Sequence, residues 1–185
     1  ILKAFEKAER IKNTQAIIKF MKFVIIGGGP TGVEMAGAIA ELSKKVLIKE
    51  FTTIDTRTAE IILLEAGSSI LSTASHGLSI YARDSLEKLG VIVKCNSVVQ
   101  SISESLVKTN NEVIEAETII WCAGVKASSL GNLINIKTDE IGRVLVNDDL
   151  SIPKHPNIFA IGDTSHVKDQ KGKPLPCLAP VAKQE

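Results

Sequence analysis

The sequence predicts an α/β fold, in which a parallel sheet carries helices on its faces and a small antiparallel insert. Short apolar runs are typical of buried strands, and segments with helical spacing lie between the first three of these runs. A further stretch holds short extended segments around an Asn-Asn pair, which is typical of an antiparallel meander. The predicted buried strands are residues 22–26, 61–65, 91–93 and 118–122.

The N-terminal third is predicted to begin with a helix. Residues 1 to about 12 have amphipathic spacing, and Asn13-Thr14 ends the pattern. After the first strand, Pro30 is suited to begin a second helix, because its missing N–H costs little in a first turn. This helix ends near Ser43, and residues 45–59 form a polar, irregular stretch before the second strand.

The remaining elements are shorter. A helix is predicted over residues 78–89, and Gly90 is suited to its C-terminal cap. The predicted meander comprises residues 98–102, 105–108 and 112–114, with its turn at Asn110-Asn111. Toward the C-terminus we expect a strand at 143–146, a turn at 155–157 and a last, buried strand at 158–163.

Three glycines, Gly27, Gly29 and Gly32, stand between the first strand and the helix that follows it. In this arrangement the first glycine permits a sharp turn, the second leaves room for a phosphate, and the third lets the helix approach its strand. The N–H groups and the positive dipole end of the helix then face an anion. The pattern therefore predicts a site for the pyrophosphate of a dinucleotide.

An acid is expected at the end of the second strand, where it accepts hydrogen bonds from the adenosine ribose. Glu50 has the expected spacing from the glycines, but it follows only a modest apolar run. Glu65 lies farther along and follows a much stronger strand. We favour Glu65, because a polar insertion before a strand costs little stability. A carboxylate there repels a 2′-phosphate and so predicts NADH rather than NADPH; the alternative is a solvated glutamate.

Two further acids lie at predicted element ends. Glu34 is two residues past Gly32, in the predicted first turn of the helix. There it either stabilises the helix dipole or lies near the reacting end of a cofactor. Asp163 follows Gly162 at the end of the last predicted strand, where α/β proteins bind ligands, although a turn residue fits that place equally well.

Charge and composition narrow the classes of function. The 185 residues include 22 basic and 21 acidic residues, which gives a formal net charge of +1. Because no basic run is interleaved with aromatic residues, we expect no nucleic-acid partner. A hydrophobic content of 44% supports a sizeable core. All apolar runs are of strand length, shorter than a membrane span.

Cysteines and histidines suggest no redox or metal centre. Cys95, Cys122 and Cys177 form no closely spaced pair, so neither a disulfide framework nor a local dithiol is expected. We expect Cys95 and Cys122 to be buried structural residues. The three scattered histidines, at positions 76, 155 and 166, are predicted to be turn or surface residues, and no metal-ligand cluster is expected.

Several segments carry the motifs of one family. They are Gly27–Gly37, Ile62–Gly67, Trp121–Ser128, Gly142–Val144, Ile158–Asp163 and Leu178–Gln184. Together these segments resemble the type II NADH dehydrogenases, over nearly the whole chain. Such enzymes are single-chain flavoproteins that pass electrons from NADH through FAD to a membrane quinone without pumping protons. The glycine motif is shared by all two-dinucleotide flavoproteins, whereas the alanine-proline tail and the insertion before Glu65 are more specific to this family.

The resemblance implies roles on the NADH side. It assigns Glu65, rather than Glu50, to the adenosine ribose, with Ala66 beside it. It places Glu34 near the nicotinamide and the flavin, with a proton role in quinone reduction. The pyrophosphate would be held by Gly27, Gly29, Pro30, Thr31 and Gly32, and Ala123 and Gly124 would line the nicotinamide.

The resemblance also implies roles on the flavin side. Gly162 and Asp163 would belong to the FAD domain, where Asp163 binds the ribityl or pyrophosphate part. Ala179 would also contact the cofactor, and Gln184 would lie on the quinone side of the flavin. Glu34 and Gln184 are therefore the candidate catalytic residues.

By this resemblance, residues 22–150 of the chain form the Rossmann-like NADH-binding domain of a two-dinucleotide flavoprotein. A helical lead-in, residues 1–21, and a return segment, residues 151–185, would belong to the FAD domain. The family's N-terminal FAD unit and its C-terminal membrane helices have no counterpart in the sequence, so we expect no quinone reductase activity from the chain alone. We expect residues 151–185 to be poorly anchored or to pair with a second copy.

The intact protein would be cytoplasmic and peripheral on the inner face of the membrane. Two alternatives remain open at this point. One is another FAD-dependent NAD(P)H oxidoreductase, of the ferredoxin or rubredoxin reductase type. The other is a module that binds NADH without chemistry.

Overall fold

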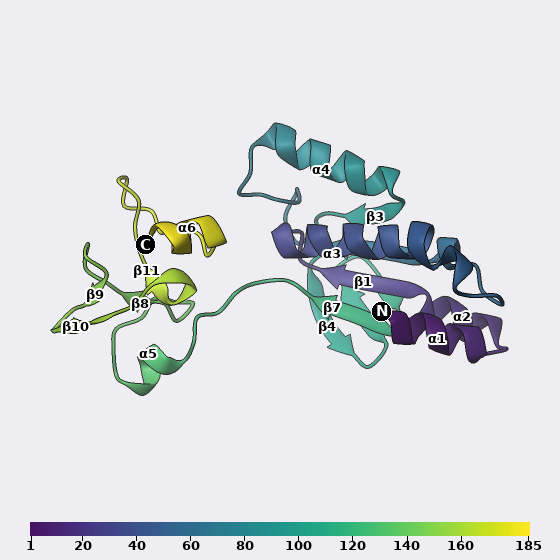
Figure 1. The fold of residues 1–185 in the computed structure, drawn as a ribbon, viewed down its shortest axis with the longest axis horizontal. Coiled ribbons are helices and arrows are strands. Elements are labelled where there is room, and N and C mark those ends of the chain that lie inside the picture. The colour runs from purple at the N-terminus through teal and green to yellow at the C-terminus, as the bar shows by residue number, and fades with distance from the viewer. The chain divides into compact units, whose positions relative to one another are not determined.

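The computed structural model describes all residues, 1–185, and the chain divides into two compact units, residues 1–123 and 124–185 (Figure 1). These units are defined by compactness alone. The predicted cofactor domains, residues 22–150 with flanks 1–21 and 151–185, therefore stay predictions. No helix in the chain combines the length and the apolar character that crossing a membrane would require.

The first unit is built on a four-stranded parallel sheet in the order β3-β2-β1-β7. Its strands are β1 (Lys22–Ile26), β2 (Glu60–Leu64), β3 (Val91–Lys94) and β7 (Thr118–Trp121). The register places Val24 of β1 beside Ile62 of β2 and Ile119 of β7. The predicted parallel sheet is therefore confirmed.

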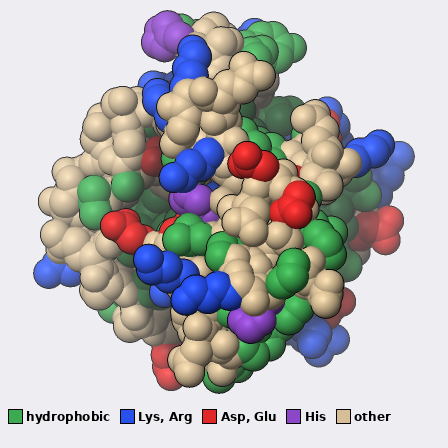
Figure 2. Space-filling model, turned by 90° about the vertical axis from the view of Figure 1, so that its left-hand side faces the viewer, with side chains coloured by type: hydrophobic (Ala, Val, Ile, Leu, Met, Phe, Trp, Pro, Cys, Tyr) green, Lys and Arg blue, Asp and Glu red, His purple; other side chains and the backbone are tan.

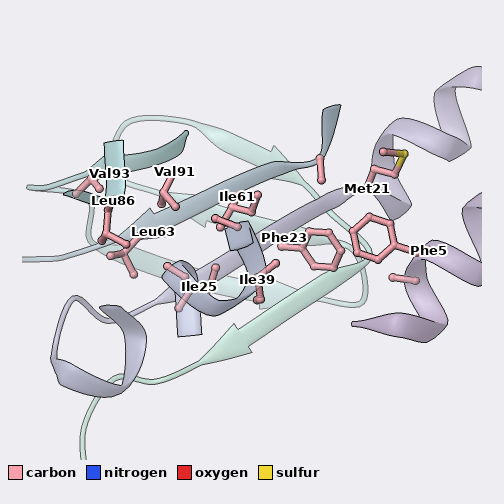
Figure 3. Packing of buried hydrophobic residues seen from close by; sticks show 14 of the residues in the cluster. Phe5, Met21, Phe23, Ile25, Ile39, Ile61, Leu63, Leu86, Val91 and Val93 are labelled. Carbon is pink, nitrogen blue, oxygen red and sulfur yellow. The ribbon is translucent and has the colours of Figure 1, made fainter. Parts of the chain in front are cut away.

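Both faces of the two central strands are buried beyond their first residues, which explains why residues 23–26 and 61–64 are continuously apolar. Side chains of one face, among them Phe23, Ile25 and Leu63, join a core with residues of α1 (Leu2–Arg10), α3 (Pro30–Glu41) and α4 (His76–Lys88) (Figure 3). Side chains of the other face, such as Val24 and Ile62, pack against Val107 and Ile114. The alternation follows the two-residue period of a strand.

The predicted helices exist, with one addition. Pro30 occupies the first turn of α3, and Gly90, with φ of +78°, donates its N–H to Glu87 O at the end of α4. The segment after α1 forms another helix, α2 (Thr14–Phe20), that was not predicted. The Asn13 side chain accepts a hydrogen bond from Ala16 N, so this residue caps α2 and does not merely end α1.

The stretch between α3 and β2 is less irregular than predicted. The helix continues as a π-helix, η1 (Leu42–Val46), and a 3₁₀ turn, η2 (Leu47–Lys49). A second 3₁₀ turn, η3 (Thr56–Thr58), follows after the irregular residues 50–55. The buried Thr56 hydroxyl donates to Ser43 O at 2.7 Å, and Lys44 Nζ donates to Leu89 O at 2.9 Å. These bonds fix η3 to η1, and η1 to the end of α4.

The predicted antiparallel meander is confirmed. It consists of β4 (Val99–Ser103), β5 (Leu106–Thr109) and β6 (Val113–Glu115), in that order. Thr109 and Glu112 close the turn at Asn110-Asn111, since Thr109 N donates to Glu112 O. The expectation that β7 is fully buried is wrong, because β7 is an edge strand and Trp121 is 60% exposed.

The second unit holds short elements: α5 (Leu130–Leu133), β8 (Val144–Leu145), β9 (Ser151–Ile152), β10 (His155–Phe159), η4 (Gly162–Thr164), β11 (Ser165–His166) and α6 (Ala179–Gln184). β8 pairs with β11 in parallel, and β9 pairs with β10 antiparallel. On the face drawn in Figure 2, Lys and Arg side chains are interspersed with Asp and Glu side chains.

The last predicted strand is wrong in its bounds and in its burial. The chain turns at Pro153-Lys154, where Lys154 has φ of +69°, so residues 155–157 lie in β10 and not in a turn. Pro156 is tolerated because β10 pairs on one side only. All residues of β10 are exposed, and the strand ends at Phe159 instead of continuing to Asp163.

His166 is not a surface residue, contrary to prediction. Its Nδ1 lies 2.8 Å from Asp139 Oδ2, and the Arg143 Nε donates to the same oxygen at 2.8 Å. The Arg143 guanidinium also donates to Leu175 O. Burial alone would raise the pKa of Asp139, but hydrogen bonds from His166 and Arg143 hold it well below its usual range. This cluster ties together three segments of the second unit.

Candidate functional site

The glycine loop lies at the point where the strand order of the sheet reverses. From β1 the chain moves outward through β2 to β3, and it later returns to the opposite side of β1 as β7. Open α/β sheets bind ligands beyond the carboxyl ends of their strands at such a point. Gly27 N donates to Leu64 O at 2.8 Å and Cys122 N donates to Ile26 O at 2.8 Å, so the loop starts in a fixed position between β2 and β7.

The three motif glycines meet three different surroundings. Gly27 has φ of +108°, and a Cβ there would lie 2.8 Å from Ala123 Cα. A Cβ on Gly32 would lie 1.8 Å from Gly27 O, so the first turn of α3 packs directly on the loop backbone. A Cβ on Gly29 would meet nothing within 4 Å. The sharp turn and the close helix packing are thus confirmed, and the space beside Gly29 is open.

An anion at this open space would face the beginning of α3. Thr31 and Gly32 belong to the first turn, whose N–H groups have no partner within the helix. Pro30 has no N–H to offer, and Pro30 and Thr31 are exposed. The open cradle at Gly29, the free N–H groups and the helix dipole together fit a pyrophosphate.

Glu65 lies directly against the glycine loop. Its Oε2 accepts the Gly28 N–H at 2.7 Å and its Oε1 accepts the Gly67 N–H at 2.6 Å. Glu65 follows the end of β2, while Glu50 lies in a turn after η2, and no strand precedes it. The structure therefore brings Glu65, and not Glu50, to the predicted site. Ala66, next to Glu65, is exposed.

Two contacts of this loop were missed in the sequence. Leu71 N donates to Gly28 O at 2.7 Å, and the Ile70 side chain lies against Gly28. The extra glycine at position 28 was the available signal, because the motif requires only Gly27, Gly29 and Gly32. The segment after β2 thus holds the glycine loop from one side.

Glu34 is the fifth residue of α3 and is exposed. The prediction that it lies in the first turn is wrong, because the helix begins at Pro30 and its first turn contains no acid. A role in stabilising the helix dipole is therefore not supported, since that effect fades beyond the first turn.

Ala123 ends the first unit, two residues past the end of β7 and beside Gly27. Gly124 follows with φ of +74° and nothing within 4 Å of the position of a Cβ. Cys122 is half-buried against the core, and burial raises the pKa of its thiol. Cys95 is likewise half-buried, and all three cysteines are free. The structure thus puts Ala123 at the carboxyl end of β7 next to the glycine loop.

The flavin-side candidates gather in the second unit. Gly162 and Asp163 lie in η4, and a Cβ on Gly162 would lie 3.4 Å from Ala182 Cβ of α6. Glu185 Oε2 accepts hydrogen bonds from Gly162 N and from Ser165 Oγ, a link the sequence did not reveal. Asp163 is exposed. The prediction that it follows a buried strand is wrong, because β10 is exposed and ends at Phe159. Ala179 and Gln184 are exposed at the two ends of α6.

A family model described as pyridine nucleotide-disulphide oxidoreductase matches residues 1–185. The chain is 39% identical over 181 residues to a type II NADH:quinone oxidoreductase of Mycobacterium tuberculosis, covering 93% of this chain and 39% of that protein. It is 30% identical over 168 residues to an internal alternative NAD(P)H-ubiquinone oxidoreductase of Arabidopsis thaliana, covering 90% of this chain and 32% of that protein. The chain therefore spans less than half the length of these curated relatives.

Two solved structures have the same fold. One is NDH2 from Plasmodium falciparum in complex with NADH, with a TM-score of 0.79 and 23% identity over 90% of this chain and 36% of that one. The other is an FAD-dependent pyridine nucleotide-disulphide oxidoreductase from Desulfovibrio vulgaris, with a TM-score of 0.67 and 26% identity over 88% of this chain and 40% of that one. The α/β fold predicted from the sequence is confirmed.

Proposed function

Because the chain belongs to the pyridine nucleotide-disulphide oxidoreductase family, we propose that it is the NADH-binding part of a flavoprotein. The intact protein would transfer hydride from NADH to FAD and pass the electrons to a membrane quinone. The observation that carries this proposal is the glycine loop with Glu65 held against it. The relatives named as NADH:quinone oxidoreductases support the choice of acceptor.

Residues of the first unit, together with Gly124, suit the parts of NADH. The pyrophosphate would lie beside Gly29, with the N–H groups of Thr31 and Gly32 directed at it. The Glu65 carboxylate would accept hydrogen bonds from the ribose hydroxyls, with Ala66 alongside it. When bound, NADH supplies the hydride. Ala123 and Gly124 would line its nicotinamide, and Glu34 would hold a proton near the reacting end.

The second unit would contribute to the FAD domain. Gly162 and Asp163 would face the ribityl or pyrophosphate part of FAD, and Ala179 would contact it. Gln184 would lie on the quinone side of the flavin. In this proposal residues 22–150 bind NADH, and residues 1–21 and 151–185 belong to the FAD domain. The chain without bound flavin would then reduce no quinone, because hydride has no acceptor.

The proposal extends to location and assembly. The intact protein would be cytoplasmic and lie peripherally on the inner face of the membrane, where its quinone is dissolved. A homodimer is supported by β10, an exposed strand in which Ile158 is 46% and Phe159 is 59% exposed. An exposed apolar strand edge favours pairing with a second copy.

The test is a titration of the purified chain with NADH and with NADPH, followed by nicotinamide fluorescence. We expect NADH to bind more tightly, and Glu65→Ala to weaken NADH binding about tenfold, the worth of one hydrogen bond to a charged group. Glu50→Ala is the matched control and should leave both affinities unchanged. Equal binding of the two nucleotides, or none, would contradict the proposal.

A further inference from the structure

We propose that Gly28, the middle glycine of the loop, is a positioning residue that sets the choice between NADH and NADPH. It does so by giving the Glu65 carboxylate a fixed place. This inference rests on the proposed binding of NADH, and it assigns a task to a position that the dinucleotide motif leaves open.

The space that a Cβ at position 28 would occupy is already filled by Glu65 and Ile70. A Cβ at this position would lie 2.8 Å from Ile70 Cγ2, 2.9 Å from Glu65 Oε2 and 3.0 Å from Glu65 Cβ. Carbon atoms that are not bonded to one another pack at about 3.5–4.0 Å, so these contacts are too short. Any side chain at position 28 therefore displaces the Glu65 carboxylate, the Ile70 methyl group, or both.

The backbone of Gly28 does not require glycine. Its φ lies outside the left-handed region, unlike that of Gly27 at +108°. The atoms that would clash belong to side chains, whereas those near Gly27 and Gly32 belong to the backbone. Gly28→Ala is thus expected to fold with its main effect on the neighbouring side chains.

Hydrogen bonds hold the carboxylate in this space. Gly28 N and Gly67 N each donate to a different oxygen of Glu65, and Leu71 N donates to Gly28 O. A carboxylate accepts about four hydrogen bonds, so each Glu65 oxygen keeps one position for a further donor. Two ribose hydroxyls can fill these positions, while a 2′-phosphate offers negative charge and no equivalent pair of donors.

The three glycines at 27, 28 and 29 therefore have separate tasks. Gly27 makes the turn, and Gly29 leaves open space for the pyrophosphate. Gly28 faces Glu65 and not that open space. Substitution at Gly29 should weaken NADH and NADPH alike, whereas substitution at Gly28 should weaken mainly NADH. This contrast separates a positioning role from a general effect on the loop.

The experiment compares Kd for NADPH with Kd for NADH in the purified chain, its Gly28→Ala and Gly29→Ala variants, and Gly28→Ala combined with Glu65→Ala. We expect Gly28→Ala to lower the ratio of Kd for NADPH to Kd for NADH about tenfold. This is the effect of losing one hydrogen bond from the ribose to the displaced Glu65 carboxylate. Gly29→Ala should weaken both nucleotides with the ratio kept. In the Glu65→Ala background, Gly28→Ala should change the ratio less than about twofold, because the two effects are coupled.

A second variant makes the test independent of how Gly28→Ala folds. Glu65→Asp keeps the charge but is one methylene too short to reach the Gly28 N–H, so the ratio should fall several-fold. A Gly28→Ala or Glu65→Asp variant that keeps the full NADH preference would overturn the inference while the proposed function stands. A parent chain that binds neither nucleotide, or binds both equally, would instead contradict the proposed function.

Discussion

Gly32→Ala tests whether the first turn of α3 packs on the glycine loop as tightly as the structure indicates. The new Cβ would lie 1.8 Å from Gly27 O, a backbone atom that cannot rotate away. Restoring an ordinary contact requires the helix and the loop to separate by about 1.5 Å or more. We set the overpacking at about 3 kcal/mol and the gain in helix propensity at about 0.8 kcal/mol, which leaves a net loss of about 2 kcal/mol.

Gly37→Ala is the matched control on the same helix. A Cβ there would lie 3.7 Å from Leu86 Cδ2, an ordinary contact, so the variant should gain about 0.8 kcal/mol from helix propensity. Urea unfolding followed by far-ultraviolet circular dichroism measures both variants. With a slope of about 2 kcal/mol per M, the Gly32→Ala midpoint should fall by about 1 M. A Gly32→Ala variant as stable as the parent, or stabilised like Gly37→Ala, would show that α3 and the glycine loop are not packed this tightly.

Two further predictions concern the carboxylates of Asp139 and Glu9, which accept hydrogen bonds from other parts of the chain. Asp139→Asn should destabilise the second unit by about 3 kcal/mol, because it leaves Arg143 buried without its charged partner. A loss of less than about 1 kcal/mol in the free energy of unfolding, measured in urea, would contradict this. Since the pKa of Asp139 is lowered in the folded state, its ionised carboxylate contributes to the free energy of unfolding above about pH 4. This contribution is lost as the pH falls through the folded-state pKa. The backbone hydrogen bond from Thr52 is the main cause that lowers the pKa of Glu9 to about 2. Glu9→Gln should therefore speed hydrogen exchange at the Thr52 and Thr53 amides. In the parent, exchange at these two amides, corrected for its intrinsic pH dependence, should speed up only as the pH falls toward 2. Unchanged protection of the amides in Glu9→Gln would count against this bond.

The sheet of the first unit was predictable because its signals are local. Strands buried on both faces must be apolar, and β1 and β2 are apolar after their first residues, Lys22 and Glu60. The helix α2 was missed although its signal was present: Asn13 is a favoured N-cap residue, and it was interpreted only as the end of the preceding helix.

The second unit was predicted less well because distant contacts decide its structure. β10 is paired with a strand of only two residues, and the turn between them places Lys154, a non-glycine residue, at positive φ. Asp139 and His166 meet across 27 positions of sequence, and no local pattern announces that contact. Their cluster appears only when the segments are folded together.

The candidate site was partly predictable. The positions of Gly27, Gly29 and Gly32 follow from the motif, and their surroundings in the structure fit the tasks that the motif assigns. The sequence already favoured Glu65 over Glu50, and the structure agrees, because residues 42–58 hold a π-helix and 3₁₀ turns where Glu50 would need a strand before it. The contact of Gly28 with Glu65 depends on side-chain packing, so spacing alone does not reveal it.

Hydrogen exchange of the purified chain, measured with and without NADH, locates the bound nucleotide and so tests whether NADH binds at the glycine loop. We predict that NADH slows exchange of the amides in residues 27–33 and 65–71, which form the glycine loop and the segment beside Glu65. Residues 99–115, in the meander, should be unaffected. Protection confined to the meander or to the second unit, with residues 27–33 unchanged, would contradict the account.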